Sequence, residues 1–103
     1  MKVYIAGPMT GLPDLNYPAF AAAAEHLRAS GHDVVSPAEV NAGREHEGWH
    51  ACMRRDVAEL TKCHAIYLLD GWPRSRGARI EMQLAKDLGL MWLKSDLSVV
   101  EMA

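Results

Sequence analysis

The sequence has few cysteines, no block of basic residues and no long apolar run, and each of these shortages argues against a class of protein. It contains 2 cysteines, Cys52 and Cys63, and they lack the C-x-x-C spacing of redox and zinc motifs. The 11 Lys and Arg are outnumbered by 13 Asp and Glu, so the net charge is −2 and duplex nucleic acid is disfavoured as a general partner. Without a signal peptide or a membrane-length apolar run, we expect a reduced, cytoplasmic protein with no membrane role.

The length and the apolar content predict one domain over residues 1–103. With 103 residues and 50% hydrophobic content, the chain can bury a modest core. Its tryptophans, Trp49, Trp72 and Trp92, provide more aromatic surface than one small core needs. We expect Trp72 to lie at a pocket rim or a subunit contact rather than to turn inward. The protein is therefore predicted to be a homo-oligomer, either a dimer or a tetramer.

Short apolar runs alternate with helical patterns along the whole chain. Strands are expected over residues 2–6, 33–36, 65–69 and 90–94, and helices over 17–30, 49–61 and from Ser75 to about Leu88. Asn16 is a plausible N-cap of the first helix. The polar segment 41–48 is expected to be a surface loop. This order predicts a flavodoxin-like or Rossmann-like three-layer α/β fold, whose parallel sheet has four to five strands in the order 2-1-3-4(-5). A ligand would then sit above Gly7 and Asp70, where the strand order reverses.

Two loops are expected at the same edge of this sheet. The first, which follows the first strand, consists of Gly7, Pro8, Met9, Thr10 and Gly11. The second precedes the last helix, where Ser75 and Gly77 fit phosphate binding at a helix N-terminus and Arg74 and Arg76 add positive charge. The alternative is an ordinary serine N-cap with solvated arginines.

Glu81 is the first candidate for a nucleophile. The helix around it is expected to bury Ile80, Leu84, Ala85 and Leu88, which leaves Glu81 beside the buried stripe and near the positive end of the helix. That position favours an ionised carboxylate, as a nucleophile requires. The alternative is a glutamate that only complements the helix dipole.

Asp56 and Asp70 each allow two interpretations. Asp56 falls between the apolar positions of its helix and could act as an acid or base partner of Glu81, or it could pair with Arg54 or Arg55. Asp70, at a strand end, could bind a ribose hydroxyl or simply turn the chain.

The segment from His46 to His50 matches the zinc-protease pattern H-E-x-x-H letter for letter. The mechanism needs both histidines on one face of a continuous helix, whereas Gly48 lies inside the motif at a predicted junction of loop and helix. No third ligand is apparent downstream. Solvated loop histidines are therefore the default, and no metal site is predicted.

Taken together, these motifs resemble the nucleoside 2-deoxyribosyltransferase superfamily, most closely its short branch in phage and bacterial genomes. The matching features span residues 3 to about 94 and are Tyr4 with Gly7-Pro8-Met9-Thr10-Gly11, Asp56 ahead of Leu60-Thr61-Lys62-Cys63, the strand Ile66 to Leu69, and Ser75-x-Gly77-x-x-x-Glu81-x-x-x-Ala85 with Gly89. Each feature is weak alone, but their order and spacing together are fairly specific.

The resemblance implies a retaining N-glycosidase or 2-deoxyribosyltransferase that needs no cofactor. Glu81 would attack the anomeric carbon of a 2-deoxyribose, Tyr4 would orient Glu81, and Asp56 would assist the leaving base. The substrate-binding set implied is Gly7, Pro8, Met9, Thr10, Gly11, Asp70, Gly71, Trp72, Ser75 and Gly77. Relatives that act on free nucleosides carry a carboxylate at the position of Ser75, whereas those that hydrolyse deoxynucleoside 5′-monophosphates carry a serine, so the small-molecule substrate is expected to be a deoxynucleotide.

Two further expectations follow from this family. A neighbouring subunit's C-terminal segment completes the pocket there, and the corresponding segment here is the tail from Ser95 to Ala103. The alternative function is a non-catalytic nucleotide-binding or sensing module, and a zinc hydrolase using His46 and His50 comes third. An enzyme would need Tyr4, Asp56 and Glu81 to converge on one cavity.

Overall fold

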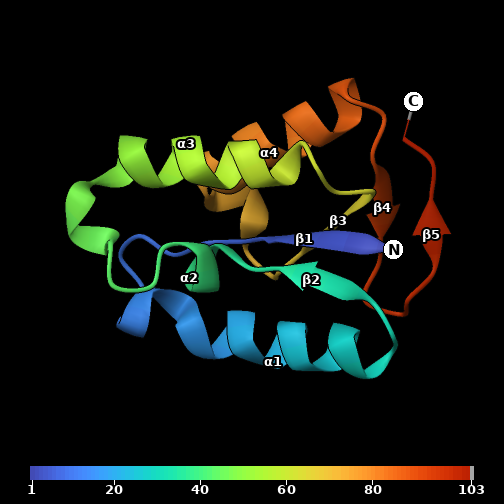
Figure 1. Ribbon diagram of the computed structural model, residues 1–103, viewed down its shortest axis with the longest axis horizontal. Coiled ribbons are helices and arrows are strands. Elements are labelled where there is room, and N and C mark those ends of the chain that lie inside the picture. The colour runs from blue at the N-terminus through green and yellow to red at the C-terminus, as the bar shows by residue number, and fades with distance from the viewer. Residues whose placement is uncertain (103) are drawn as a thin grey trace.

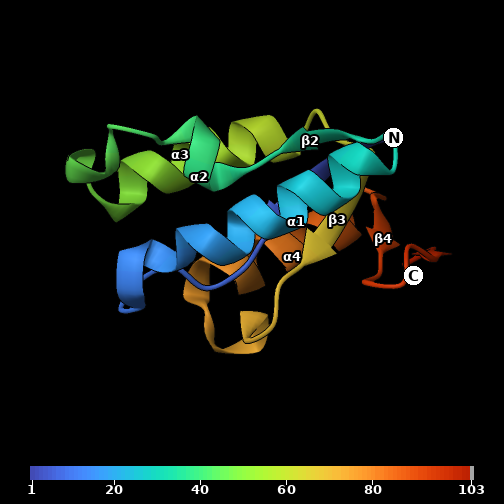
Figure 2. The same ribbon diagram turned by 90° about the horizontal axis from the view of Figure 1, so that it is seen from below.

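The computed structural model describes residues 1–102 as a central sheet with helices on both faces (Figures 1 and 2). Its strands are β1 (Lys2–Ala6), β2 (Asp33–Val35), β3 (Ala65–Leu68), β4 (Met91–Leu93) and β5 (Val99–Val100). Its α-helices are α1 (Tyr17–Ala29), α2 (Pro37–Val40), α3 (Trp49–Leu60) and α4 (Arg76–Asp87). The three-layer α/β architecture predicted from the alternation of strands and helices is confirmed.

The sheet order β2-β1-β3-β4-β5 also matches the prediction, but the last strand differs in direction. β1 pairs in parallel with β2 and β3, and β3 with β4, whereas β5 runs antiparallel to β4. The chain reverses after β4 because Lys94 N–H donates to the Ser98 carbonyl and Leu97 adopts a left-handed conformation with φ 67°. The tail therefore extends its own sheet, at the end of the molecule away from the carboxyl end of β1 (Figure 1).

Two apolar clusters hold the layers together, one on each face of the sheet. The first joins α1 to the sheet and consists of Val3, Ile5, Phe20, Ala23, Ala24, Leu27, Val34, Ala65 and Leu93. The second joins α3 and α4 to the other face and consists of Tyr4, Ala6, Leu60, Cys63, Ile66, Ala78, Met82, Ala85 and Leu90. Successive β1 side chains alternate between the clusters, as the twofold period of a strand requires. This alternation turns Tyr4 toward α4.

The face that α4 buries differs from the expected one. Its buried residues are Gly77, Ala78, Glu81, Met82 and Ala85. Ile80 and Leu88, which we expected to be buried, are 41% and 51% exposed. The small side chains at positions 77, 78 and 85 let the helix approach its neighbours closely, so the helix rotates toward them and carries Glu81 inward rather than beside the core.

Two local expectations also need correction. Asn16 does not cap α1 with its side chain, since its backbone is left-handed and its Nδ2 donates to the Pro8 carbonyl at 3.0 Å. This bond ties the chain entering α1 to the loop after β1.

Trp72 turns inward, half-buried against the second cluster. It lies in a short 3₁₀ helix, η3 (Trp72–Arg74), which follows the left-handed Gly71.

Within residues 1–102, none of the helices combines the length and the apolar character needed to cross a membrane.

Candidate active site

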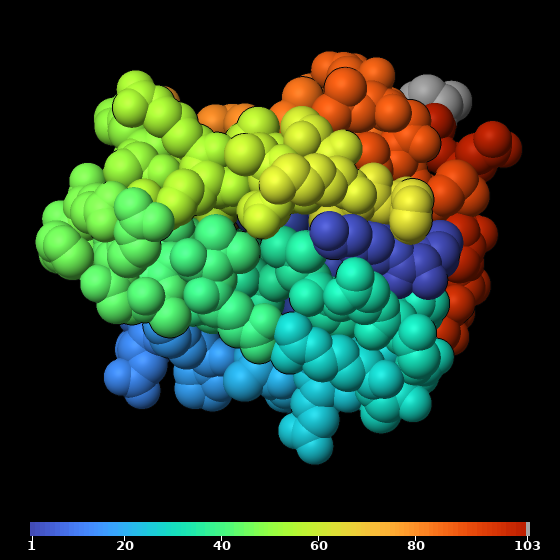
Figure 3. Space-filling model, viewed as in Figure 1, coloured from blue at the N-terminus to red at the C-terminus, as the bar shows by residue number. Residues whose placement is uncertain are grey.

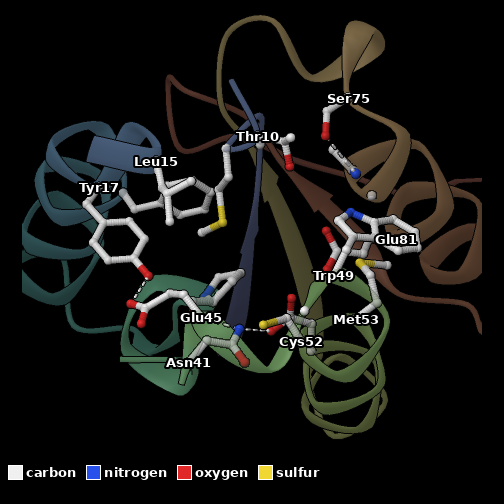
Figure 4. Close-up of a pocket in the computed structure, with 18 residues that line it drawn as sticks. Thr10, Leu15, Tyr17, Asn41, Glu45, Trp49, Cys52, Met53, Ser75 and Glu81 are labelled. Atoms are coloured by element: carbon white, nitrogen blue, oxygen red, sulfur yellow. Dashed lines mark hydrogen bonds between the residues drawn. The ribbon is translucent and has the colours of Figure 1, made fainter. Parts of the chain in front are cut away.

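A cavity of about 190 Å³ opens at the carboxyl end of β1, between α1, α3 and α4 (Figure 4). It is lined by Gly7, Met9, Thr10, Leu15, Tyr17, Phe20, Pro37, Asn41, Glu45, Gly48, Trp49, Cys52, Met53, Asp56, Ser75, Gly77, Ala78 and Glu81. A second hollow of about 510 Å³ is lined by Pro8, Met9, Thr10, Trp49, Arg74, Ser75 and Arg76. The two hollows share four lining residues, so they adjoin along the loop after β1 and the start of α4.

Glu81 is the most deeply placed carboxyl group of the cavity. It is 4% exposed, and its Oε2 accepts a hydrogen bond from the hydroxyl of Tyr4, which is fully buried. Residues 4 and 81 meet because β1 directs Tyr4 toward the face of the sheet on which α4 packs. The predicted association of Tyr4 with Glu81 is thus present in the geometry.

The protonation of Glu81 differs from the expectation of an ionised group. Burial raises its pKa to about 8; the Tyr4 hydrogen bond lowers the pKa and the negative charge of Asp56 raises it, but both effects are smaller than that of burial. Glu81 is the sixth residue of α4, and the helix dipole acts mainly within the first turn. Desolvation therefore outweighs the helix terminus, and the pKa of Tyr4 is likewise raised, by burial first and by Glu81 second.

Asp56, on α3, is the second buried carboxyl group of the cavity. It is 5% exposed, and its Oδ1 accepts a hydrogen bond of 2.7 Å from Asn41 Nδ2. Burial raises the pKa of Asp56 to about 6, while the Asn41 hydrogen bond and the charge of Arg55 oppose that rise. Arg55 forms its ion pair with Glu47 at 2.8 Å, so the alternative of a direct Asp56–arginine pair is not observed.

The start of α4 is built for close packing as well as for capping. Ser75 Oγ accepts a hydrogen bond from Ala78 N–H at 3.2 Å, which confirms the predicted N-cap. A Cβ at Gly77 would lie 3.1 Å from Met53 Sδ, so glycine lets α3 and α4 approach each other here. The Arg76 guanidinium lies 4.4 Å from the ring centre of Trp49, which holds it beside the second hollow.

The structure brings together most of the residues singled out in the sequence, but not all of them. The first cavity is lined by Gly7, Met9, Thr10, Asp56, Ser75, Gly77 and Glu81, the second hollow adds Pro8, and Tyr4 lies behind Glu81. Four of the implied substrate-binding residues, Gly11, Asp70, Gly71 and Trp72, line neither hollow. The chain turns away from the cavity after β3, which leaves Asp70 exposed and carries Trp72 back onto the core.

Sequence reasoning missed a group of residues that line the cavity, of which Leu15, Tyr17, Asn41 and Glu45 lie at the end away from Glu81 (Figure 4). They include Leu15, Tyr17, Phe20, Pro37, Asn41, Glu45, Cys52 and Met53. The Tyr17 hydroxyl donates to Glu45 Oε1 at 2.6 Å, which joins α1 to the segment before α3. The polar composition of residues 41–48 predicted only a surface loop. Nothing local in that segment revealed that Asn41 is buried.

The two histidines of the H-E-x-x-H match do not share a helix. His46 lies in a 3₁₀ helix, η2 (Glu45–Glu47), and His50 lies in α3. Gly48 separates them with φ 98°, a conformation that glycine adopts readily. In the described part of the chain, no three His, Cys, Asp or Glu side chains are grouped to hold a metal ion.

Comparison with known proteins identifies a family for this chain. The family model of DUF4406, a domain of unknown function, matches residues 1–93. The chain belongs to the DUF4406 family. Among solved structures, this DUF4406 domain is similar to a 2-deoxyribosyltransferase from the psychrotolerant bacterium Bacillus psychrosaccharolyticus.

The two proteins share 20% sequence identity at a TM-score of 0.69, and the match covers 91% of the DUF4406 chain and 72% of the other chain. Identity at this level shows a common fold, and the resemblance to nucleoside 2-deoxyribosyltransferases is thereby confirmed for the fold. A comparison with curated proteins finds no match.

Proposed function

We propose that this DUF4406 domain cleaves the N-glycosidic bond of deoxynucleosides or deoxynucleoside 5′-monophosphates through a covalent intermediate on Glu81. The observation that carries the proposal is the pair of buried carboxyl groups, Glu81 and Asp56, that face one small cavity while Tyr4 holds the first of them. Paired carboxyl groups with separated pKa values are typical of enzymes that cleave glycosidic bonds.

With these pKa values, the two carboxyl groups together hold the one proton that the reaction needs. Near pH 7, Glu81 with a pKa of about 8 carries a proton, and Asp56 with a pKa of about 6 is ionised. Transfer of this proton from Glu81 to Asp56, directly or through water, produces a nucleophile and an acid together.

The Glu81 carboxylate then attacks the anomeric carbon and forms a C–O bond. The C–N bond breaks, its electron pair goes to the base nitrogen, and Asp56 supplies the proton that neutralises the leaving base. Water or a second base displaces Glu81 from the sugar, which completes hydrolysis or transfer, and a proton returns to the carboxyl pair.

The shape of the cavity supports a substrate with an aromatic end and an anionic end. Leu15, Tyr17 and Phe20 form an apolar wall suited to the faces of a base. At the opposite side, Ser75 lies at the start of α4, where the adjoining hollow adds Arg74 and Arg76. Backbone N–H groups and arginines favour a phosphate there.

Mass spectrometry of the intact protein, incubated with a panel of deoxynucleosides and deoxynucleotides, tests the proposal. We expect a mass increase equal to one deoxyribosyl or phosphodeoxyribosyl group, and peptide mapping should place it on Glu81. Glu81→Gln is the matched control and should acquire no adduct. Binding of a nucleotide without adduct or base release would instead support a nucleotide-binding module.

The phosphate preference can be measured without catalysis. If the start of α4 binds phosphate, a deoxynucleoside 5′-monophosphate should bind at least about tenfold more tightly than the matching nucleoside, which corresponds to about 1.4 kcal/mol of additional protection against thermal unfolding. Ser75→Asp keeps an N-cap but adds a negative charge. This variant should reverse the preference, whereas equal thermal shifts for both ligands in the wild-type protein would argue against the phosphate site.

We also propose that the protein is a homo-oligomer that uses the exposed flank of α4. Ile80 and Leu88 are exposed, and the half-buried Leu84 lies between them at helical spacing. Light scattering at micromolar concentration should report a mass above that of one chain, and Leu88→Lys should lower it. A monomer mass, with activity unchanged on dilution, would contradict this proposal.

A further inference from the structure

We propose that Asn41 is a positioning residue for Asp56 and the last link of a hydrogen-bonded chain that runs from Glu47 through Arg55 to Asn41. The catalytic meaning of this inference depends on the proposed function, because it assigns Asp56 a role there. The structural claim, that Asn41 fixes the Asp56 carboxylate and keeps it ionised, stands on contacts that exist without substrate.

The side chain of Asn41 has one orientation. Asn41 is 4% exposed and immediately follows α2. Its Nδ2 donates to Asp56 Oδ1 at 2.7 Å and to the Pro37 carbonyl at 3.0 Å, and its Oδ1 accepts from Arg55 Nε at 2.9 Å. Exchanging the amide oxygen and nitrogen would face oxygen against oxygen and N–H against N–H. The surroundings therefore determine which end of the amide meets the carboxylate.

Arg55 is itself held in place. Its Nη1 donates to Glu47 Oε1 at 2.8 Å. Glu47 also accepts two hydrogen bonds from Arg44, at 2.8 and 3.2 Å, so the pair is anchored from both sides. The hydrogen-bonded chain thus runs from the surface before α3 to the cavity. α2 and α3 lie against each other there, and in Figure 3 the green surface of residues 37–48 is continuous with the yellow-green surface of α3. Figure 4 shows Asn41 at the cavity end of this chain.

The Asn41 amide lies between Arg55 and Asp56, and this placement affects the pKa of Asp56. A direct arginine pair would hold the pKa of the carboxyl well below its usual range. Here the amide donates a hydrogen bond to the carboxylate while the guanidinium lies one link away, and the pKa of Asp56 stays at about 6. Asp56 is therefore ionised at neutral pH and is still able to accept a proton.

Charged and titratable groups from several elements surround Asp56, and only some of them favour its ionised form. Glu81 on α4 is coupled to Asp56 through repulsion between the two carboxylates, which favours keeping one of the pair protonated. Tyr4 on β1 and Tyr17 on α1 have their pKa values raised in part by the charge of Asp56. Arg55 and the Asn41 amide are the groups that favour its ionised form. Removal of Asn41 should consequently raise the pKa of Asp56.

An NMR pH titration of the Asp56 carboxyl carbon tests the inference without any substrate. In Asn41→Leu the midpoint should rise by at least one pH unit relative to the wild type, and in Arg55→Gln it should rise by a smaller amount. Arg44→Gln is the comparison variant, since the Arg44 side chain bonds Glu47 but not the Asn41 side chain, and its backbone N–H keeps its bond to the Asn41 carbonyl; it should move the midpoint less than Arg55→Gln does. Arg55→Gln also keeps the inference testable if Asn41→Leu does not fold.

If base release is observed, the acid limb of the kcat/KM pH profile of Asn41→Leu should shift to higher pH together with the Asp56 midpoint. A general loss of stability would not produce this shift. An unchanged Asp56 midpoint in both Asn41→Leu and Arg55→Gln would overturn the inference. A raised midpoint without any glycosidase activity would instead count against the proposed function and leave the role of Asn41 in place.

Discussion

Glu81→Gln is expected to lower the rate of base release by at least about 10³-fold while the protein stays folded. The amide has nearly the shape of the carboxyl group and can still accept the Tyr4 hydrogen bond, but it cannot form the glycosyl ester. Because Glu81 is 4% exposed, water cannot easily take its place in the same geometry. The rate is measured by chromatography of the free base in single-turnover conditions.

Tyr4→Phe is the matched control for this measurement. It removes the hydroxyl that donates to Glu81 and leaves the nucleophile in place. We expect this variant to lose part of the activity, on the order of 10- to 100-fold, with the covalent adduct still formed. Base release by Glu81→Gln at the wild-type rate would remove Glu81 from the mechanism, whatever the result for Tyr4→Phe.

The sequence predicted the sheet edge that carries the site because two signals there are local. Apolar runs mark β1 and β3, and glycines with a serine cap mark the loops that follow β1 and precede α4. Parallel strands connected by helices then bring these loops to one edge. The loops after β1 and before α4 were therefore predictable neighbours, whereas the contact between Tyr4 and Glu81 was expected only from the family resemblance.

The orientation of α4 could not be predicted from its pattern alone. Ile80, Leu84 and Leu88 form one apolar stripe, and the small residues with Met82 form another that overlaps it. Hydrophobicity favours the first stripe, whereas close packing of α4 against α3 and β1 selects the second. This choice decides whether Glu81 is beside the core or within it, and so decides its protonation state.

The far wall of the cavity was unpredictable for a different reason. Asn41 and Glu45 belong to a polar segment that has the composition of a surface loop, and only tertiary contacts reveal what they do. The reversal after Lys94 was missed because it is held by one backbone hydrogen bond and a left-handed Leu97, a conformation that leucine rarely adopts.

The second large effect concerns stability, which we expect to fall as pH rises from about 5 to 8. A carboxyl group whose pKa is higher in the folded than in the unfolded protein binds more protons when folded, so unfolding becomes easier as pH passes from the unfolded to the folded pKa. For Glu81 this range runs from 4.5 to about 8, and for Asp56 from 3.8 to about 6. Each pKa unit corresponds to about 1.4 kcal/mol, so the loss should reach several kcal/mol.

Glu81→Gln should remove most of this pH dependence, since glutamine does not ionise. We expect the variant and the wild type to have similar free energies of unfolding near pH 4.5, and the variant to be more stable by several kcal/mol at pH 8. Urea unfolding followed by tryptophan fluorescence at pH 5, 6.5 and 8 measures the difference. Glu25→Gln, at an exposed position of α1, is the matched control and should run parallel to the wild type.

If the free energies of unfolding of Glu81→Gln and the wild type changed in parallel with pH, Glu81 would ionise in the folded protein as freely as in solvent. Glu81 would then not carry the proton that the proposed reaction needs near pH 7. Divergent curves would have a second consequence. The substitution that removes base release would also stabilise the protein at pH 8, because the wild-type protein buries an ionisable group there and no Lys, Arg or His of residues 1–102 forms an ion pair with it. A stabilising loss of function of this kind is what a site kept for chemistry produces, and a carboxyl group that only complemented a helix dipole would give the opposite sign.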